Sequence, residues 1–202
     1  EDSRELVKRL GNGERMMGTS CCAAYIEAVH KHNPKFLPFV SDAKTPLAYT
    51  SDIARKRYPG TVTVFIGPCI AKKHEVVSGG VADYAITFEE LTAILESLEI
   101  DVPACNESVP DISVASRKGK LFPVSGNVAS AIAESVSNVA SISVTVAKID
   151  GFTRKNIGSL TDFVDGAPPA NLIEVMSCEG GCVAGSGTIE KPQIAAKKIT
   201  QS

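Results

Sequence analysis

The distribution of cysteines constrains this chain of 202 residues more than any other feature of its sequence. The six cysteines are Cys21, Cys22, Cys69, Cys105, Cys178 and Cys182. An even number suggests a disulfide framework, but chains rich in disulfides are usually small and exported. Here the thiols sit in clusters within a mid-sized chain, and its first residues are rich in charge, unlike a signal peptide. Metal-binding or catalytic thiolates are therefore the favoured interpretation.

Composition narrows the class of protein. The chain is 44% hydrophobic and 22% charged, with a net charge of -2, which suits one or two packed lobes. Without a basic stripe, nucleic acid is not expected as a partner. No apolar run approaches the roughly 20 residues that cross a bilayer, so we expect no membrane partner and a cytoplasmic location.

Helix and strand signals alternate, which predicts an α/β fold with mixed or parallel sheets flanked by helices. Thr19 and Ser20 are expected to cap the first helix, which the two adjacent thiols would open. The polar stretch 101–120 predicts a long loop where two lobes would meet. The expected helices cover residues 21–31, 46–57, 87–98, 127–136, 156–164 and 192–199, and the expected strands cover 61–66, 142–149 and 172–176.

The cysteines occur in three motifs rich in small residues. These are TSCC at 19–22, GPCIAKKHE at 67–75 and EVMSCEGGCVAG at 174–185. A 4Fe-4S cube needs about four thiolates, and small neighbours allow backbone N–H groups to approach its sulfides. Zinc accepts four thiolates equally well but usually uses paired C-x2-4-C knuckles, of which there is one here. Buried structural thiols are a third alternative.

In this order, TSCC, PCxxKxxE and ExMxCxGGCxxG resemble the signature segments of the FeFe-hydrogenase catalytic domain. Segments 34–46, 83–91 and 122–126 also resemble the family, so the resemblance spans residues 18–185. It implies catalytic-domain-like lobes and an H-cluster, in which a 4Fe-4S cube is joined to a di-iron subsite carrying CO, CN and a dithiolate amine.

The resemblance also implies metal ligands. Cys22, Cys69, Cys178 and Cys182 would hold the cube, and the Cys182 sulfur would bridge to the di-iron subsite. Cys21 would stay unligated and pass protons to a relay, which suits a group that donates and accepts. A small residue at a helix start is the alternative role of Cys21.

Further residues would face the di-iron subsite. Lys72 would direct its ammonium at a cyanide ligand, with Lys73 as the alternative. Met176 and Phe122 would bind the cofactor by packing beside it. Glu75 would fix the loop.

The remaining polar candidates carry weaker signals. Ser41 falls where the family's proton relay has a serine, although it could be an ordinary turn hydroxyl. The relay's carboxylates precede TSCC, and Glu1 lies near the matching distance without being assigned. The histidines are His30, His32 and His74, and without paired spacing they are not expected to be ligands.

Several positions depart from the family pattern. Gly67 replaces a methionine, Ala23 a proline and Leu47 a frequent glutamine, which indicates a divergent subgroup. Family members also carry a lobe before TSCC. Residues 1–202 are therefore expected to be a partial H-cluster domain, a fragment that holds the cube poorly and does not retain a complete H-cluster.

The implied function is an enzyme of anaerobic hydrogen metabolism. It would reduce protons to H2 reversibly, with electrons from ferredoxin or a similar redox carrier. A hydrogen-sensing homologue and a non-enzymatic iron-sulfur homologue are the alternatives. Cys21 favours the enzyme, because such relatives tend to lack or replace this cysteine.

Overall fold

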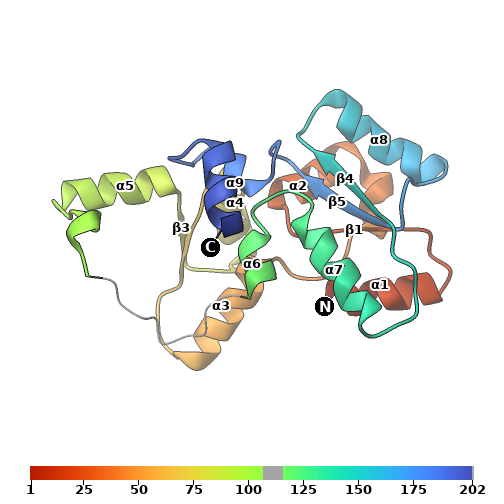
Figure 1. Ribbon diagram of the computed structural model, residues 1–202, viewed down its shortest axis with the longest axis horizontal. Helices are drawn as coiled ribbons and strands as arrows, with labels where there is room; N and C mark the ends of the chain where they lie inside the picture. Colours follow the sequence, from red (N-terminus) through yellow and green to blue (C-terminus); the bar gives the residue numbers. More distant parts are fainter. Residues whose placement is uncertain (107–115, 202) are drawn as a thin grey trace.

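The computed structural model describes residues 1–106 and 116–201, which form two parallel sheets with flanking helices (Figure 1). Strands β1 (Met17–Gly18), β5 (Leu172–Met176) and β4 (Val146–Asp150) form the larger sheet in that order. Strands β2 (Val64–Ile66) and β3 (Tyr84–Ile86) form the smaller one. Each of these pairings is parallel, which confirms the α/β class.

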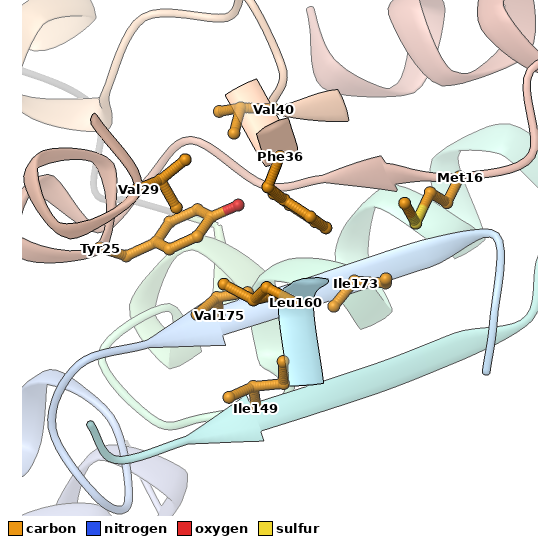
Figure 2. Close-up of a cluster of buried hydrophobic side chains, with 9 residues drawn as sticks. All are labelled: Met16, Tyr25, Val29, Phe36, Val40, Ile149, Leu160, Ile173 and Val175. Atoms are coloured by element: carbon orange, nitrogen blue, oxygen red, sulfur yellow. The ribbon is translucent and has the colours of Figure 1, made fainter. Parts of the chain in front are cut away.

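The central strand β5 is buried on both faces. Ile173 and Val175 pack in one cluster with Tyr25 and Phe36, which face them across the core in Figure 2. Leu172 and the other alternate residues face the opposite way. A parallel strand that carries apolar side chains on both sides has to be covered on both sides. The covering helices are α1 (Asp2–Gly11) and α7 (Asn127–Ser137) on one face, and α2 (Ala23–His32), η1 (Pro34–Phe39) and α8 (Arg154–Asp165) on the other.

The smaller sheet is covered less completely. Its buried cluster contains Leu47, Val76 and Ala82. On β2, Val64 and Ile66 are 47% and 44% exposed, so one face of this sheet lies open. Its helices are α3 (Pro46–Arg57), α4 (Ile70–Gly79) and α5 (Phe88–Ser97).

The remaining elements are short or lie late in the chain. They are η2 (Val102–Ala104), α6 (Arg117–Leu121), η3 (Cys182–Ala184) and α9 (Pro192–Gln201). The prediction of one long loop over 101–120 is wrong in the described part, because Ser116 caps α6 by accepting the N–H of Gly119. Residues 107–115 lie outside the described chain, and the division into two lobes there stays a prediction.

The helix predictions are accurate where the sequence contains a capping residue at the start of the helix. Helix α3 and strand β5 have the predicted bounds, and Thr87 and Glu90 form the predicted capping box of α5. The prediction that Thr19 and Ser20 cap α2 is wrong. The Thr19 N–H donates to the Ile173 carbonyl, which extends the pairing of β1 with β5. The Ser20 hydroxyl donates to the Ala43 carbonyl at 2.6 Å.

Two strands differ from their predicted bounds because a strand ends where its partner ends. Strand β2 begins at Val64, not at residue 61, since β3 offers only three residues. Strand β4 covers Val146–Asp150 instead of 142–149, in register with β5. Within residues 1–106 and 116–201, no helix has the length and apolarity that crossing a membrane requires.

Candidate metal centre

Two of the four expected ligand cysteines stand at helix starts. Cys22 is the N-cap of α2 and Cys69 is the N-cap of α4, each with an extended backbone. The first turn of a helix exposes backbone N–H groups, which stabilise an anionic sulfur. Hydrogen bonds from the backbone at Ser177 and Tyr25 also reach the Cys22 sulfur. Burial is nevertheless the larger influence and raises the pKa of Cys22, so a bound metal would have to displace the proton of this thiol.

The other two cysteines, Cys178 and Cys182, follow β5 in a turn that depends on glycine. Gly180 and Gly181 have φ values of +90° and +94°, which side chains rarely adopt. A Cβ on Gly181 would lie 2.6 Å from the Pro123 carbonyl oxygen. The turn can therefore pack closely against the segment before α7.

The four thiols influence one another electrostatically. Burial, followed by the charges of Cys22, Cys69 and Cys178, raises the pKa of Cys182 to about 12. Burial and the charges of Cys22 and Cys69 also raise the pKa of Cys178. Lys72 opposes these effects at Cys182 and Cys22. The fold thus gathers four thiols from separate segments and adds one cation.

The spacing of the donors bears on which metal they fit. Among residues 1–106 and 116–201, no three Cys, His, Asp or Glu side chains form a group that could hold a metal ion. Four thiolates on one zinc would lie about 3.8 Å apart, given the Zn–S bond length. Each thiolate of a 4Fe-4S cube binds a different iron, which separates the sulfurs further. The described thiols therefore do not form a single-ion site of the zinc type, although they lie near enough to influence one another.

A cavity of about 340 Å³ adjoins these thiols. Leu47, Phe65 and Val128 contribute apolar wall, which shields the space from water. The cavity brings together all of the expected site residues except Cys178 and Ser41. Those in its wall are Cys21, Cys22, Cys69, Lys72, Phe122, Met176 and Cys182.

The Lys72 side chain is only 11% exposed, and its ammonium lies 2.6 Å from Oε2 of Glu75. The other Glu75 oxygen accepts a hydrogen bond from the Thr45 hydroxyl. Lys73 instead pairs with Glu90 and is 34% exposed. The structure therefore favours Lys72 over Lys73 as the cation beside the cavity.

Cys21 lies in the cavity wall just before α2. Burial raises the pKa of its thiol to about 12. The thiol donates to the Thr19 hydroxyl oxygen at 3.8 Å. Cys21 thus keeps its proton in the metal-free chain, with the Thr19 hydroxyl oxygen as acceptor.

Ser41 is buried, and its hydroxyl lies within hydrogen-bond distance of two carboxylates. Its Oγ lies 3.0 Å from Asp2 and 2.7 Å from Glu5. Arg9 donates to Glu5 at 2.7 Å and to the Val40 carbonyl at 3.0 Å. Sequence reasoning considered Glu1 and missed Asp2 and Glu5, because no local signal in the sequence places the first helix beside Ser41.

The two carboxylates differ in acidity. Burial raises the pKa of Asp2, and its hydrogen bond with Ser41 offsets only part of this effect. Burial also raises the pKa of Glu5, but hydrogen bonds from Ser41, the Asp42 N–H and Arg9 outweigh this effect, so the pKa is lowered overall. Groups whose pKa values are pushed apart can divide the roles of acid and base.

The three departures from the family pattern all lie in the wall of the cavity. These positions are Ala23, Leu47 and Gly67. A Cβ at Gly67 would lie 2.6 Å from the Phe65 ring, so that ring fills space that a side chain at 67 would need. These three positions therefore help to shape the cavity wall beside the cysteines.

Glu174 is fully buried on β5 and carries a role that sequence reasoning did not assign. Its carboxylate accepts the N–H groups of Gly126 at 2.5 Å and Ala129 at 2.7 Å, at the start of α7. A carboxylate there satisfies unpaired donors and complements the helix dipole. Glu174 thus fixes α7 against the strand that leads to Cys178.

The other candidate donors lie at the surface. His30, His32 and His74 are exposed, as is Cys105, whose thiol donates to the Asp101 carbonyl at 3.4 Å.

Comparisons with known proteins show the family of this chain. The family model described as iron only hydrogenase large subunit, C-terminal domain, matches residues 1–186. The chain is 30% identical over 242 residues to the periplasmic Fe hydrogenase large subunit of Nitratidesulfovibrio vulgaris. It is 25% identical over 247 residues to iron hydrogenase 1 of Clostridium pasteurianum. These matches cover 96% and 98% of this chain but 57% and 42% of the relatives, so the chain spans about half their length.

Solved structures share the fold. A structure described as revealing stepwise H-cluster assembly in an FeFe-hydrogenase matches with a TM-score of 0.74 and 22% identity. An apo FeFe-hydrogenase of Chlamydomonas reinhardtii, a variant protein, matches with a TM-score of 0.74 and 21% identity. Each match covers 100% of this chain and 69% of the other. The predicted likeness to hydrogenase lobes is thereby confirmed at the level of the fold.

Proposed function

This chain belongs to the family of iron only hydrogenase large subunits, matching its C-terminal domain, and from that premise we propose that it supplies the H-cluster site of a hydrogenase. The reaction would be the reversible reduction of protons to H2. The observation that carries the proposal is the single cavity whose wall contains Cys21, three ligand cysteines, Lys72, Met176 and Phe122.

The ligands of the cube would be Cys22, Cys69, Cys178 and Cys182. Their mutual electrostatic influence and the glycine turn between the last two support this assignment. When bound, an H-cluster would pass electrons from the carrier to protons and provide the metal site for their reduction. The protein would supply the thiolates and a shielded space.

The side chains around the cavity would have separate tasks. Lys72 would present its ammonium to an anionic ligand in the cavity, where its charge is shielded little by water. Met176, buried at the end of β5, and Phe122 would exclude water by packing beside the bound group. These roles rest on the family motifs and on the positions of the side chains in the cavity wall.

Protons would enter and leave the cavity through Cys21. The thiol would hand a proton between the cavity and the polar groups outside it. Ser41, held between Asp2 and Glu5, would carry protons further toward solvent. Arg9 would hold Glu5 in place.

Electrons would come from ferredoxin or a similar carrier. A relative from Solidesulfovibrio fructosivorans is named an NADP-reducing hydrogenase subunit, which shows that another carrier occurs among relatives. A cytoplasmic location stays a prediction, and the relative from Nitratidesulfovibrio vulgaris is named as periplasmic.

The test is reconstitution without oxygen. The chain is loaded with iron and sulfide, then with a synthetic di-iron dithiolate complex carrying CO and CN. Iron-sulfur absorption, Fe–CO infrared bands and H2 evolution from reduced methyl viologen are measured. Cys21→Ala should keep the bands and lose H2 evolution about 100-fold, as expected for loss of a proton-transfer group. Cys105→Ala, at the exposed cysteine, should match the unaltered chain.

Each other outcome identifies an alternative. Iron-sulfur absorption without Fe–CO bands would favour the non-enzymatic homologue. Bands with little H2 evolution, unaffected by Cys21→Ala, would favour a hydrogen sensor. Absence of both signals would contradict the proposed function. Less than one cube per chain would support the prediction that this partial domain holds the cube poorly.

A further inference from the structure

Glu75 lies between Lys72 and a residue of another helix. Its Oε2 lies 2.6 Å from the Lys72 ammonium, and its Oε1 accepts from the Thr45 hydroxyl. Lys72 and Glu75 are both on α4, whereas Thr45 precedes α3. The side chain of Glu75 is 16% exposed, so water competes little for the carboxylate. The pair on α4 is thus tied to a second helix.

Thr45 is itself held firmly. It is the N-cap of α3, and its hydroxyl oxygen accepts the N–H of Ala48 at 3.3 Å. Pro46 follows at the first helical position, where its fixed φ stiffens the helix start. One hydroxyl therefore caps α3 and donates to Glu75. The direction of this donor is set by the start of α3 and not by a flexible side chain.

The position of Lys72 needs such a support. A lysine has four rotatable methylene groups, and its ammonium takes many positions unless a partner fixes it. A carboxylate on the same helix is a partial restraint, since its own side chain can also rotate. A second hydrogen bond to the far oxygen of Glu75 removes that freedom. A fixed charge stabilises a bound group better than a mobile one.

The neighbouring pair is also held at two points but is more exposed to water. Lys73 pairs with Glu90, whose side chain is 46% exposed. Glu90 also accepts the N–H of Thr87, within its own helix start. This pair lies outside the wall of the 340 Å³ cavity. It provides a lysine of the same helix as an internal reference.

We propose that Thr45 is a positioning residue for Lys72 and acts through Glu75. Thr45 and Glu75 also line a cavity of about 610 Å³, whereas Lys72 lines the cavity of the candidate metal centre. The chain of contacts from Thr45 to Lys72 therefore crosses the wall between the two cavities. The inference rests on the proposed function for the purpose that Lys72 serves, but the contacts can be tested without any metal.

The first measurement uses the metal-free chain. Acetic anhydride is added in a short pulse, and mass spectrometry compares acetylation of Lys72 with that of Lys73 in the same molecules. Thr45→Val removes the hydroxyl and keeps the shape of the side chain. It should raise the ratio of Lys72 acetylation to Lys73 acetylation about fivefold, as expected from loss of one hydrogen bond. Thr45→Ser keeps the hydroxyl and should restore the ratio.

A matched control separates capping from positioning. Thr153 caps α8 by accepting the Asn156 N–H at 3.1 Å, and it lies outside the cavity wall. Thr153→Val should lower thermal stability as Thr45→Val does, because each loses one cap, but should leave the Lys72 ratio unchanged. Glu75→Gln should raise the ratio, and adding Thr45→Val to it should change nothing further, because both act on one path.

The second measurement uses the chain loaded with the synthetic di-iron complex. Thr45→Val should shift and broaden the cyanide infrared bands more than the carbonyl bands, and Thr45→Ser should restore them. An unchanged Lys72 ratio in Thr45→Val, or an additive effect in the double variant, would overturn the proposal. If the unaltered chain shows no Fe–CO bands, the proposed function fails, and the acetylation ratio still decides the role of Thr45.

Discussion

The two sheets of this molecule differ sharply in how they are packed. All five residues of β5 in the larger sheet are buried, and helices cover both of its faces. In the smaller sheet, β2 and β3 contain no buried residue, and none of the residues of α5 is buried. We call these regions the firm half, around β1, β4 and β5, and the loose half, around β2 and β3. In Figure 1 the loose half extends to the left, as far as α5.

The candidate metal centre draws on both halves. Cys22, Cys178 and Cys182 belong to the firm half, where Cys22 packs against both of its buried clusters. Cys69 and Lys72 come from α4 in the loose half. A bound cluster would therefore connect a well-packed wall to a weakly packed one, and ligand binding would stabilise the latter more. We therefore expect metal binding and folding to be coupled mainly through Cys69.

The largest expected effect comes from matched core truncations. Leu172→Ala in the firm half should cost about 4 kcal/mol, because a fully buried leucine leaves a cavity that the neighbours cannot fill. Leu47→Ala in the loose half should cost about 2 kcal/mol, since less packed surroundings can collapse. Urea denaturation of the metal-free chain measures both. Equal losses would abolish the distinction between the halves.

The next largest effect is expected when a bound cluster can no longer connect the firm half to the loose half. Cys69→Ser should weaken binding of the cube by at least about 100-fold, because loss of a ligand costs more than loss of a group that only supports a ligand. Iron and sulfide should protect β2 and β3 from hydrogen exchange in the unaltered chain and should no longer do so in Cys69→Ser. Cys105→Ser is the matched control and should bind iron normally. Protection of β2 and β3 in Cys69→Ser would show that the halves are coupled through other contacts.

A smaller loss of stability is expected when the buried carboxylate of Glu174 in the firm half is replaced. Glu174→Gln replaces one acceptor oxygen by an amide donor, which then faces a backbone N–H at the start of α7. The expected loss is about 2 kcal/mol, as for an unsatisfied buried donor. Glu179→Gln, on the exposed part of the same segment, should change stability little. Equal midpoints in urea would mean that apolar packing alone fixes α7.

The smallest effect concerns pH and the α1 helix of the firm half. The pKa of Glu5 is lowered below its ordinary value of 4.5, so its stabilising contribution is present above that pH and is lost as pH falls through the lower folded value. Glu5→Gln should therefore cost about 1 kcal/mol near neutral pH and flatten the loss of stability in acid.

Asp2 should show the opposite dependence of stability on pH. Its pKa is raised, so its contribution is present below its ordinary value of 3.8 and is lost as pH rises through the folded value. Asp2→Asn should consequently make the chain relatively more stable near neutral pH. Thermal unfolding between pH 3 and pH 7 distinguishes the two variants, and parallel pH profiles would contradict the assignment.

Sequence predicted those features that local chemistry determines. Helix α3 follows from Thr45 and Pro46 at its start, and β5 follows from a short apolar run. The resemblance of the cysteine motifs to the family implied which four thiols would bind metal, and that assignment stays a prediction. The single cavity that contains Cys21, Lys72 and Met176 agrees with what the motifs implied, while the roles of these residues stay predictions.

Other features depend on contacts between distant segments and had no local signal. Strands β1 and β3 have two and three residues, too few for a periodic pattern. The carboxylates near Ser41 could be identified only once α1 had docked against residues 38–42. The buried Glu174 resembles any polar residue in a strand until the start of α7 lies beside it.

The parallel pairing of Gly18 with Ile173 also bears on how the protein is made. Synthesis proceeds from the N-terminus, so the segment of Cys22 leaves the ribosome long before its partner strand exists. Closing a loop of this length is slow, because non-local strand pairing must wait for chain entropy to be overcome. The four thiols can meet only after residue 182 has been made. Any loading of a cluster would have to follow that point, and until then the nascent chain carries unpaired thiols that a reducing environment protects.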